Sequence, residues 1–316
     1  MRALGLYSGG LDSTLAIKIM MAHNIEVIPI GYRTPFFSPD VEYGERVIGV
    51  PIVIVDVFEE YIDVLLSPSY GYGSNMNLCI DCHRFMIKKT KLLLPLYGAS
   101  FIITGEVLGE RPMSQNKWAL KEVEKEAEGL VVRPLSGKLL PPTIPEQNGW
   151  INREWLYDIS GRKRDRQMKL AELFGIKEYK NPAGGCLLTD INFSKRLRFL
   201  LGLNTRPSRE ELELLRFGRH FYVNDSWIII GRNERENIII KDASLWEFKL
   251  FSIDYPGPTG IIVRGDSLEV GARLLVRYSD APKGMNSRVR VFKKTGESYI
   301  LEVDGMPEEE IEKIRI

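Results

Sequence analysis

The segment SGGLDS near the N-terminus combines small and polar residues of the types that bind phosphate. Gly9 and Gly10 permit a tight turn and a close approach of the backbone, and Ser8 and Ser13 add hydroxyl donors. Asp12 supplies a carboxylate of the kind that holds Mg²⁺ against phosphate oxygens. The segment lacks the lysine of a Walker A loop, which points away from γ-phosphate transfer. A plain helix-capping turn is the alternative interpretation.

Three cysteines form a second candidate site. Cys79 and Cys82 make a CxxC pair with His83 beside it, and Cys186 lies in the glycine-rich segment NPAGGCLL. An odd number of cysteines in a reducing compartment argues against a disulfide framework. Four interpretations stay open: a zinc site with His83 as fourth ligand, a redox pair that carries a persulfide, a [4Fe–4S] cluster on three thiolates with one iron open, and unrelated buried thiols.

The elements that must position these residues in the first half of the chain alternate between strand and helix. Hydrophobic and β-branched runs predict strands at 2–7, 25–32, 50–57 and 100–107, and helical spacing predicts helices at 11–23 and about 81–96. A strand, a helix and a strand within about thirty residues form a βαβ unit. The expected fold class is therefore α/β, a parallel sheet with helices on both faces.

The pattern changes after about Leu135. The proline-rich stretch PLSGKLLPPTIPE predicts a long ordered connection without an element of its own. A basic helix is expected at about 162–174, and a further helix at 192–218, where Ser208 and Glu211 have the spacing of a capping box.

Beyond Phe217 the pattern predicts β structure throughout. The expected strands are WIIIG, ENIII, EFKLF, GIIVRG, ARLLVRY, SRVRVF and SYILEV, and residues 308–312 are expected to be a solvated helix face. We divide the chain into a catalytic domain at 1–190, a helical connection at 191–217 and a β-rich domain at 218–316, a candidate tRNA-binding domain.

Composition narrows the class of protein. With 316 residues, 44% hydrophobic and 27% charged, the chain has room for about two globular domains. Lys and Arg number 43 against 42 Asp and Glu, so a nucleic-acid partner must be met by local basic patches. The N-terminus lacks the apolar stretch of a secretory signal, and no run of 18 apolar residues follows. We expect a cytoplasmic protein with no membrane association.

The SGGLDS segment resembles the signature of the PP-loop ATP pyrophosphatases, which adopt an adenine nucleotide alpha hydrolase-like fold. The segments at 102–115, 133–146, 159–176 and 181–190 together resemble the tRNA thiouridine synthetases, particularly the 4-thiouridine synthetase group and its cluster-dependent relatives. The resemblance covers about residues 1–200. It implies that a substrate oxygen attacks the α-phosphate of ATP and leaves pyrophosphate and an adenylated intermediate.

The resemblance also implies roles for individual residues. Pyrophosphate and Mg²⁺ would be bound by Ser8, Gly9, Gly10, Asp12 and Ser13. The adenine would be read near the end of the second strand, at Ile30 and Tyr32, and the nucleotide site would be completed by Gly105 and Arg111. A [4Fe–4S] cluster would be held by Cys79, Cys82 and Cys186. Asp12 and the three cysteines are the candidate catalytic residues.

Two regions are candidates for contact with tRNA. Gln115 follows a strand end, and residues 161–180 carry seven basic residues against three acidic ones, which predicts a track for the phosphate backbone through Arg162, Lys163, Arg164 and Arg166. The C-terminal domain mixes Arg232, Arg235, Arg264, Arg273, Arg277, Arg288 and Arg290 with Trp227, Trp246 and Tyr278. The alternatives are a solvated helix face and aromatic core residues.

The expected function is an ATP-dependent tRNA sulfurtransferase that converts a uridine to thiouridine, with free sulfide or a sulfur-carrier protein as donor. The alternatives are the same reaction through a cysteine persulfide, an ATP pyrophosphatase that acts on a small molecule, and a non-catalytic nucleotide- and RNA-binding protein. The chain departs from its relatives in two ways, because it shows neither the THUMP domain of the 4-thiouridine synthetases nor the zinc ribbons of the 2-thiouridine enzymes. The sequence leaves open the uridine modified and whether the protein is a homodimer.

Overall fold

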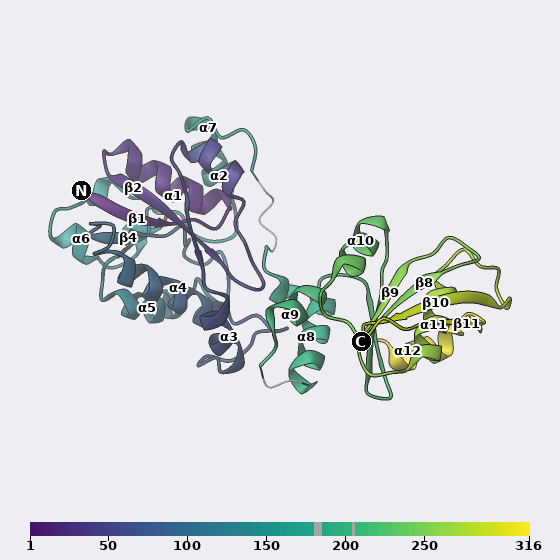
Figure 1. The fold of residues 1–316 in the computed structure, drawn as a ribbon. Helices are drawn as coiled ribbons and strands as arrows, with labels where there is room; N and C mark the ends of the chain where they lie inside the picture. The colour runs from purple at the N-terminus through teal and green to yellow at the C-terminus, as the bar shows by residue number, and fades with distance from the viewer. Residues whose placement is uncertain (180–184, 204–205) are drawn as a thin grey trace. The chain divides into compact units, whose positions relative to one another are not determined.

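The computed structural model describes residues 1–179, 185–203 and 206–316. Lys180 and residues 181–184, which belong to the basic segment and to the NPAGGCLL motif, lie outside the described residues. The chain divides into two compact units, 1–190 and 191–316 (Figure 1). Residues 191–217, expected as a separate connection, group with the second unit. Within the described ranges, no helix has the length and apolar character needed to cross a bilayer.

The first unit is built on a five-stranded sheet in which every neighbouring pair is parallel. Its strands are β1 (Arg2–Leu6), β2 (Glu26–Arg33), β3 (Val53–Asp56), β4 (Phe101–Ile103) and β5 (Val131–Val132). The order is β3-β2-β1-β4-β5, so β1 is central, and Ala3 and Leu4 on it are fully buried. The predicted strands are confirmed.

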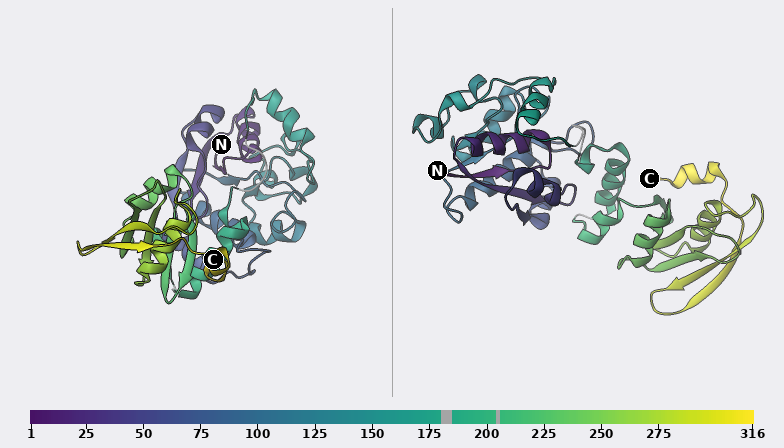
Figure 2. Two further views of the ribbon diagram at one scale, coloured as in Figure 1. Left: turned by 90° about the vertical axis from the view of Figure 1, so that its right-hand side faces the viewer. Right: turned by 90° about the horizontal axis from the view of Figure 1, so that it is seen from above.

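Helices cover both faces of this sheet, as Figure 1 and the two further views in Figure 2 show. On one face lie α1 (Leu11–Ala22), α2 (Val41–Ile48) and α7 (Asp165–Leu173), and on the other α4 (Cys79–Leu93) and α5 (Lys117–Glu124). The predicted fold class is therefore confirmed. The helices α2, α3 (Phe58–Leu66) and α5 were not predicted from the sequence. A single side chain begins α2, since Asp40 accepts from the Tyr43 amide at 3.1 Å.

The proline-rich connection contains elements that were not expected. It holds η2 (Gly137–Leu139) and the one-turn helix α6 (Ile144–Gln147), which starts with a capping box formed by Thr143 and Glu146. Pro145 fits because the first turn of a helix tolerates a missing amide. Other short 3₁₀ turns are η1 (Lys125–Ala127), η3 (Arg153–Trp155) and η4 (Leu187–Thr189).

The second unit begins with two helices, α8 (Ile191–Leu203) and α9 (Arg209–Leu214), where one was predicted. The expected capping box is confirmed, since the Ser208 side chain accepts from the Glu211 amide and Glu211 accepts from the Ser208 amide. That box begins a new helix and so divides the predicted one.

A six-stranded antiparallel sheet follows, in the order β11-β10-β8-β9-β7-β6. The strands are β6 (Arg219–Val223), β7 (Ser226–Ile230), β8 (Phe248–Ser252), β9 (Thr259–Arg264), β10 (Ser287–Lys293) and β11 (Ser298–Val303). The chain ends with α12 (Glu308–Ile314), a helix as expected, although its Ile311 is buried rather than solvated.

Two segments predicted as strands are helices, namely ENIII in α10 (Glu234–Asp242) and ARLLVRY in α11 (Leu268–Arg277). Asn233 begins α10 by accepting from the Glu236 amide at 3.0 Å. Along α11 the buried residues Gly271, Ala272 and Leu275 recur at helical spacing and pack on the sheet. The β-branched runs led to the wrong prediction because a short apolar run fits both the two-residue period of a strand and the 3.6-residue period of a helix.

A candidate nucleotide and thiol site

The SGGLDS segment connects the end of β1 to the start of α1, as predicted. Gly9 has φ +76°, a conformation that favours glycine, and Gly10 precedes the first helical residue in an extended conformation. The Ser13 hydroxyl donates to the Gly10 carbonyl at 2.9 Å and accepts from the Ser8 amide at 3.2 Å. Ser13 therefore shapes the loop. The exposed Ser8 and the N-terminus of α1 are groups of the kind that bind anions.

The loop is packed against the end of β4 through Gly105. A Cβ atom on Gly105 would lie 2.4 Å from the Ser13 amide nitrogen and 2.5 Å from the Asp12 carbonyl carbon. Such distances are far below van der Waals contact, so only glycine lets β4 approach the start of α1 this closely. Gly105 thus sets the position of the loop.

Two further segments approach this loop. Leu108 pairs with Ser160 in a parallel bridge, and the Gly161 amide donates to the Leu108 carbonyl at 2.8 Å. Gly109, with φ +79°, lies beside Gly161. The loop after β4 and the segment before α7 are therefore neighbours at the carboxyl end of the parallel sheet, where α/β folds bind ligands.

Five side chains from these three segments each carry a buried polar atom without a hydrogen-bond partner among the described residues. They are Asp12, Glu110, Gln115, Arg164 and Gln167. Buried polar atoms are nearly always satisfied in folded proteins, so this group indicates a missing ligand or solvent. We call these five residues the polar cluster.

The charges of the polar cluster interact strongly. Burial raises the pKa of Asp12 above its usual value, against the opposing charges of Arg164 and Arg111. Burial and the neighbouring Asp12 carboxylate raise the pKa of Glu110 to about 7. Two adjacent carboxylates with free oxygens fit Mg²⁺, which takes one or two carboxylates in addition to substrate phosphates. Glu110 and Gln167 were missed by the sequence analysis, because nothing in the local pattern marks them.

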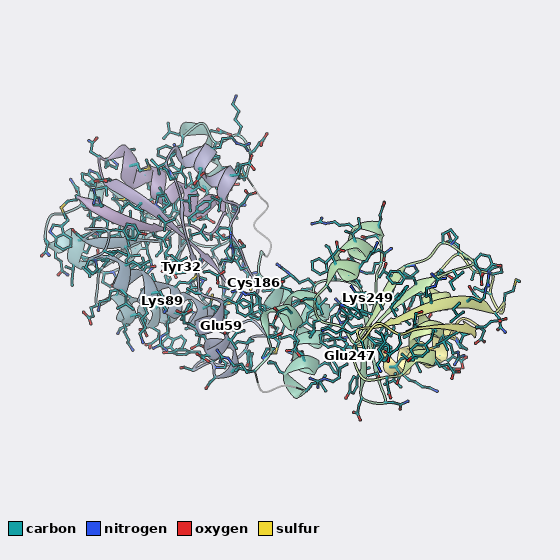
Figure 3. All side chains as sticks on the ribbon, in the orientation of Figure 1. Tyr32, Glu59, Lys89, Cys186, Glu247 and Lys249 are labelled. Atoms are coloured by element: carbon teal, nitrogen blue, oxygen red, sulfur yellow. The ribbon has the colours of Figure 1, made fainter. Side chains whose placement is uncertain are left out.

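The three cysteines come together beside this site, and Figure 3 labels Cys186 among the side chains. Cys79 is the first residue of α4, and Cys82 lies one turn later. The segment that carries Cys186 is held near the start of α4 by two backbone hydrogen bonds. The Leu187 amide donates to the Phe36 carbonyl, and the Met76 amide donates to the Leu188 carbonyl. No two of these cysteines form a disulfide.

The thiols are close enough to affect each other's ionisation. Burial raises the pKa of Cys82 to about 12, and the neighbouring Cys186 and Cys79 thiols raise it further while the Tyr61 hydroxyl opposes this. Burial also raises the pKa of Cys186 to about 11, with Arg111 acting in the opposite direction. Arg111 therefore lies within electrostatic reach of the polar cluster and of Cys186.

The described residues do not form a zinc site. The His83 Nδ1 atom is 2.7 Å from Glu106 Oε1, which engages that ring nitrogen. Among the described residues, no three His, Cys, Asp or Glu side chains converge on one metal ion. A [4Fe–4S] cluster takes one thiolate per iron and so needs wider spacing than a single ion, and a cluster on Cys79, Cys82 and Cys186 stays a prediction.

A buried network holds the start of α4 against the sheet, and the sequence analysis did not find it. Glu106 accepts from Arg133 Nε at 2.9 Å and from the Thr104 hydroxyl at 3.0 Å, in addition to contacting His83. Although burial opposes it, the Arg133 charge and the His83 contact lower the pKa of Glu106 to about 2. The TGE sequence after β4 was the available signal, because a buried acid at a strand end needs partners.

Several predicted site residues lie elsewhere than expected. Ile30 and Tyr32 are buried, and their main chain pairs with β3, while the Ile30 carbonyl also accepts from the Tyr7 amide. An adenine subsite at Ile30 and Tyr32 stays a prediction. It would have to use backbone N–H or C=O groups that do not take part in the pairing with β3. Gln115, expected to contact nucleic acid, is only 6% exposed and belongs to the polar cluster.

The basic segment is only partly available to RNA. Arg162 and Lys163 are exposed, whereas Arg166 pairs with Asp158 at 2.6 Å and Arg164 turns toward the polar cluster. The segment therefore presents fewer unpaired cations than its composition suggests.

The aromatic and basic residues singled out in the second unit are mostly structural. Trp227 is 1% exposed and donates to His220 Nδ1 at 3.1 Å. Ion pairs occupy Arg232 with Glu236, Arg273 with Asp304 and Glu310, Arg277 with Glu308, and Arg288 with Asp254. Sequence alone could not separate these paired arginines from free ones.

Residues 218–315 match the family model described as the NFACT protein RNA binding domain, a match that spans β6 to α12 and less than half of the chain. No curated protein matches the chain in sequence.

Three solved structures resemble the chain weakly. A predicted subunit of tRNA methyltransferase from Methanocaldococcus jannaschii is 15% identical, with a TM-score of 0.32 over 42% of this chain and 69% of that one. A 4-thiouridine synthetase in complex with RNA and ATP is 19% identical, with a TM-score of 0.39 over 68% and 49%. NMN synthetase from Francisella tularensis is 12% identical, with a TM-score of 0.27 over 58% and 89%. These scores are too low to transfer a function.

Proposed function

We propose that this protein is an ATP-dependent tRNA sulfurtransferase that adenylates a uridine carbonyl oxygen and replaces AMP with sulfur. The observation that carries the proposal is the juxtaposition of the polar cluster with three neighbouring thiols, joined by the charge of Arg111. A phosphate loop beside a sulfur-bearing site is the arrangement that such a reaction needs. The motifs that resemble tRNA thiouridine synthetases support the same conclusion.

The loop and the polar cluster would bind the triphosphate of ATP. The amides at the start of α1 would donate to phosphate oxygens, and Arg111 and Arg164 would neutralise their charge. Asp12 and Glu110 would hold Mg²⁺, which neutralises and orients phosphate oxygens when bound. This assignment gives the unpartnered atoms of the cluster their partners.

The reaction balances in two displacements. First, the uridine carbonyl oxygen attacks the α-phosphorus of ATP, the bond to the bridging oxygen breaks, and pyrophosphate leaves. Next, hydrosulfide adds at the uracil carbon that bears the adenylated oxygen, AMP leaves with that oxygen, and solvent takes the released proton. With a persulfide donor, the terminal sulfur adds in the same way, and a second thiol must then attack the donor sulfur, which leaves a disulfide and frees the thiouridine. Adenylation is needed because a carbonyl oxygen is a poor leaving group and AMP is a good one.

Cys79, Cys82 and Cys186 would hold a [4Fe–4S] cluster, which supplies one iron with an open position for sulfur when it is bound. Burial raises the pKa of Cys82 to about 12 and that of Cys186 to about 11, so both thiols are protonated at neutral pH when no metal is bound. A thiol that stays protonated at neutral pH is a weak nucleophile, whereas a bound metal deprotonates it outright. The Glu106 and His83 contact keeps α4 in place for this.

The substrate class rests on the second unit. The match of residues 218–315 to an RNA binding domain model supports an RNA substrate over a small-molecule acceptor. It also makes residues 218–315 the candidate docking region for the tRNA.

The test is anaerobic incubation of unmodified tRNA with reconstituted protein, ATP, Mg²⁺ and sulfide, followed by mass spectrometry of the nucleosides. The wild-type protein should form a thiouridine, and the chromatographic identity will distinguish the 2-thio from the 4-thio product. Cys186→Ala should form none while still binding ATP. AMP release without a thionucleoside, even with a protein sulfur donor added, would assign the ATP chemistry to a small-molecule acceptor instead.

A control separates loss of chemistry from loss of fold. Asp12→Asn should abolish AMP formation, whereas Asp63→Asn, an exposed aspartate on α3, should leave it unchanged. AMP formation that survives in Asp12→Asn would contradict the phosphate site. Absence of AMP formation in every protein, wild type included, would favour a non-catalytic nucleotide- and RNA-binding role.

A further inference from the structure

The sheet of the second unit has one face that the helix α11 covers and another that stays open over β8, β10 and β11. Side chains alternate along β10. Val289 and Val291 are fully buried and belong to the core with α11, whereas Arg290 and Phe292 point to the other face and are exposed. Phe251 on β8 pairs directly with Arg290 and so lies on the same open side.

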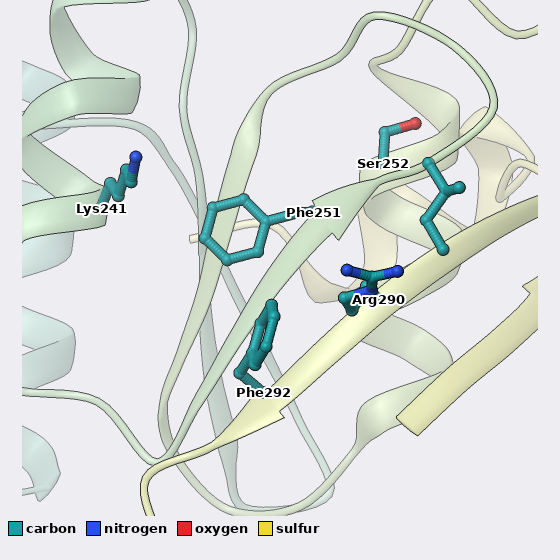
Figure 4. Close-up of a pocket in the computed structure, with 6 residues that line it drawn as sticks. Lys241, Phe251, Ser252, Arg290 and Phe292 are labelled. Carbon is teal, nitrogen blue, oxygen red and sulfur yellow. The ribbon is translucent and has the colours of Figure 1, made fainter. Parts of the chain in front are cut away.

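The open side holds a cavity of about 400 Å³, which lies within the roughly 300–1,000 Å³ range of small-ligand sites. It is lined by Lys241, Phe251, Ser252, Ile253, Arg290 and Phe292 (Figure 4). No carboxylate is among the described residues that line it. We call this cavity and its six lining residues the sheet-face pocket.

Two aromatic rings meet at the pocket. The centroids of Phe251 and Phe292 are 5.8 Å apart and the rings are inclined by 73°, so they meet edge to face and do not stack. Phe292 is 38% exposed, which is costly for an aromatic ring on a strand. An exposed ring beside a cavity is a surface on which a flat partner can stack.

The charge of the pocket is positive and unpaired. Arg290 makes no side-chain hydrogen bond or ion pair with any residue that the structure describes. Arg288, two residues away, is held by Asp254 at 2.6 Å, which shows that the same strand can pair an arginine. Lys249, opposite Phe292 on β8, adds a further cation, with Nζ 4.4 Å from the Trp246 ring centroid.

We propose that the sheet-face pocket holds one unpaired nucleotide of an RNA strand. The base would stack on Phe292, with Phe251 in contact at its edge, and Arg290 and Lys241 would meet the phosphates. Stacking on an exposed aromatic ring combined with free cations is the chemistry by which proteins hold single-stranded RNA, whose bases are not covered by pairing. The match of residues 218–315 to an RNA binding domain model supports this class of partner.

The inference deepens the proposed function. It rests on that function in one respect, which is that the bound RNA is the substrate tRNA. Because stacking needs an unpaired base, the pocket selects loops and single-stranded ends over helical stems. It would therefore position tRNA by a feature that a basic surface alone does not recognise.

The test measures binding of a fluorescein-labelled single-stranded RNA, and of its duplex, to the full chain by fluorescence anisotropy without ATP. Phe292→Ala should bind the single strand roughly tenfold more weakly, from the loss of one stacking contact. Phe292→Leu keeps apolar volume at the site and should show the same loss, which excludes unfolding as the cause. Duplex binding should change little.

A matched control uses the other face of the same hairpin. Tyr299 on β11 is 41% exposed but pairs with Val291, so it lies on the side opposite to Phe292. Tyr299→Ala should bind the single strand as the wild type does. Arg290→Gln should weaken binding and reduce the slope of log K against log salt by about 0.7 for a single strand.

Two outcomes would overturn the inference and leave the face as a surface for a protein partner. One is an equal loss of single-strand affinity in Phe292→Ala and Tyr299→Ala. The other is unchanged single-strand affinity in both Phe292→Ala and Phe292→Leu. The result is independent of catalysis. A protein that binds single-stranded RNA through this pocket but forms no thiouridine would disprove the proposed function alone, and one that forms thiouridine with unaltered RNA binding in the variants would disprove the pocket alone.

Discussion

Gly105 and Ser13 are in direct backbone contact, because a Cβ atom at Gly105 would fall 2.4 Å from the Ser13 amide nitrogen. The contact joins β4 to the start of α1 and fixes the phosphate loop against the strand that leads into Glu110 and Arg111. Any side chain at this position must push the loop away from the polar cluster.

We therefore expect Gly105→Ala to lower AMP formation by roughly a hundredfold, since a misplacement of about 1 Å in a positioning element costs that much. Overpacking should also lower the free energy of unfolding by about 1–3 kcal/mol. The matched control is Gly202→Ala on α8, where an added Cβ meets nothing within 4 Å. That variant should keep full activity, and an equally active Gly105→Ala would show that the contact does not position the loop.

Removing the charge of Asp12 should separate function from stability. Asp12→Asn should reduce pyrophosphate release by two orders of magnitude or more, because the carboxylate would lose its hold on Mg²⁺ and phosphate. Burial raises the pKa of Asp12 and one of its oxygens has no partner, so the melting temperature should stay the same or rise. If the melting temperature and the pyrophosphate release of Asp12→Asn both fell strongly, Asp12 would have a structural role.

The Glu106 network predicts acid sensitivity of the first unit. Its carboxyl group has a pKa of about 2 in the folded chain against an ordinary 4.5, so the folded state favours the ionised form. The resulting stabilisation, about 3 kcal/mol, is complete above pH 4.5 and is lost as the pH falls toward 2. Glu106→Gln should unfold more easily at pH 7 and show a smaller loss between pH 4.5 and 2, as measured by urea titration. An unchanged pH dependence would contradict the assignment.

His220 makes the second unit sensitive in a different pH range. Burial lowers its pKa from 6.5 to about 3, and the neutral ring accepts from Trp227 Nε1 and contacts the Phe217 carbonyl. The unfolded chain takes up this proton below pH 6.5 and the folded chain does not, so stability should fall by about 3 kcal/mol between pH 6.5 and 4. His220→Asn should remove that slope when unfolding is followed by the fluorescence of Trp227. A slope that persists in His220→Asn would point to other groups.

Metal content provides the most direct check of the thiol site. After anaerobic reconstitution, the wild-type chain should bind about four irons with matching acid-labile sulfide, and Cys79→Ala, Cys82→Ala or Cys186→Ala should each lose most of this iron. Because the apo thiols carry raised pKa values, reconstitution should be more complete at pH 8 than at pH 6.5. Near-zero iron in the wild type would favour the persulfide route.

Local sequence was sufficient for the βαβ start of the chain. The apolar run before SGGLDS and the helical spacing after it predict β1, a glycine-rich turn and α1, and all three are present. The CxxC pair was likewise placed at the start of a helix, close to the predicted 81–96. These predictions succeed because a glycine-rich turn and the start of a helix are defined by residues within one or two turns of each other.

Local sequence was insufficient where a short apolar run fits two periods. The segments ENIII and ARLLVRY were predicted as strands and form α10 and α11. The cap at Asn233 and the small residues Gly271 and Ala272, which allow α11 to lie against the sheet, decide in favour of helix. Contacts with a sheet made from distant strands outweigh the β preference of Ile and Val.

The sequence by itself determined which residue types this protein has for phosphate and sulfur chemistry, and on which elements they lie. Only the tertiary structure decided that Glu110 and Gln167 join Asp12, that Cys186 reaches Cys79 and Cys82, and that Arg290 stays unpaired while Arg288 does not. The physical reason is that charge interactions and desolvation depend on distances between residues that are far apart in the chain, and those distances exist only once the sheets have brought their strand ends together.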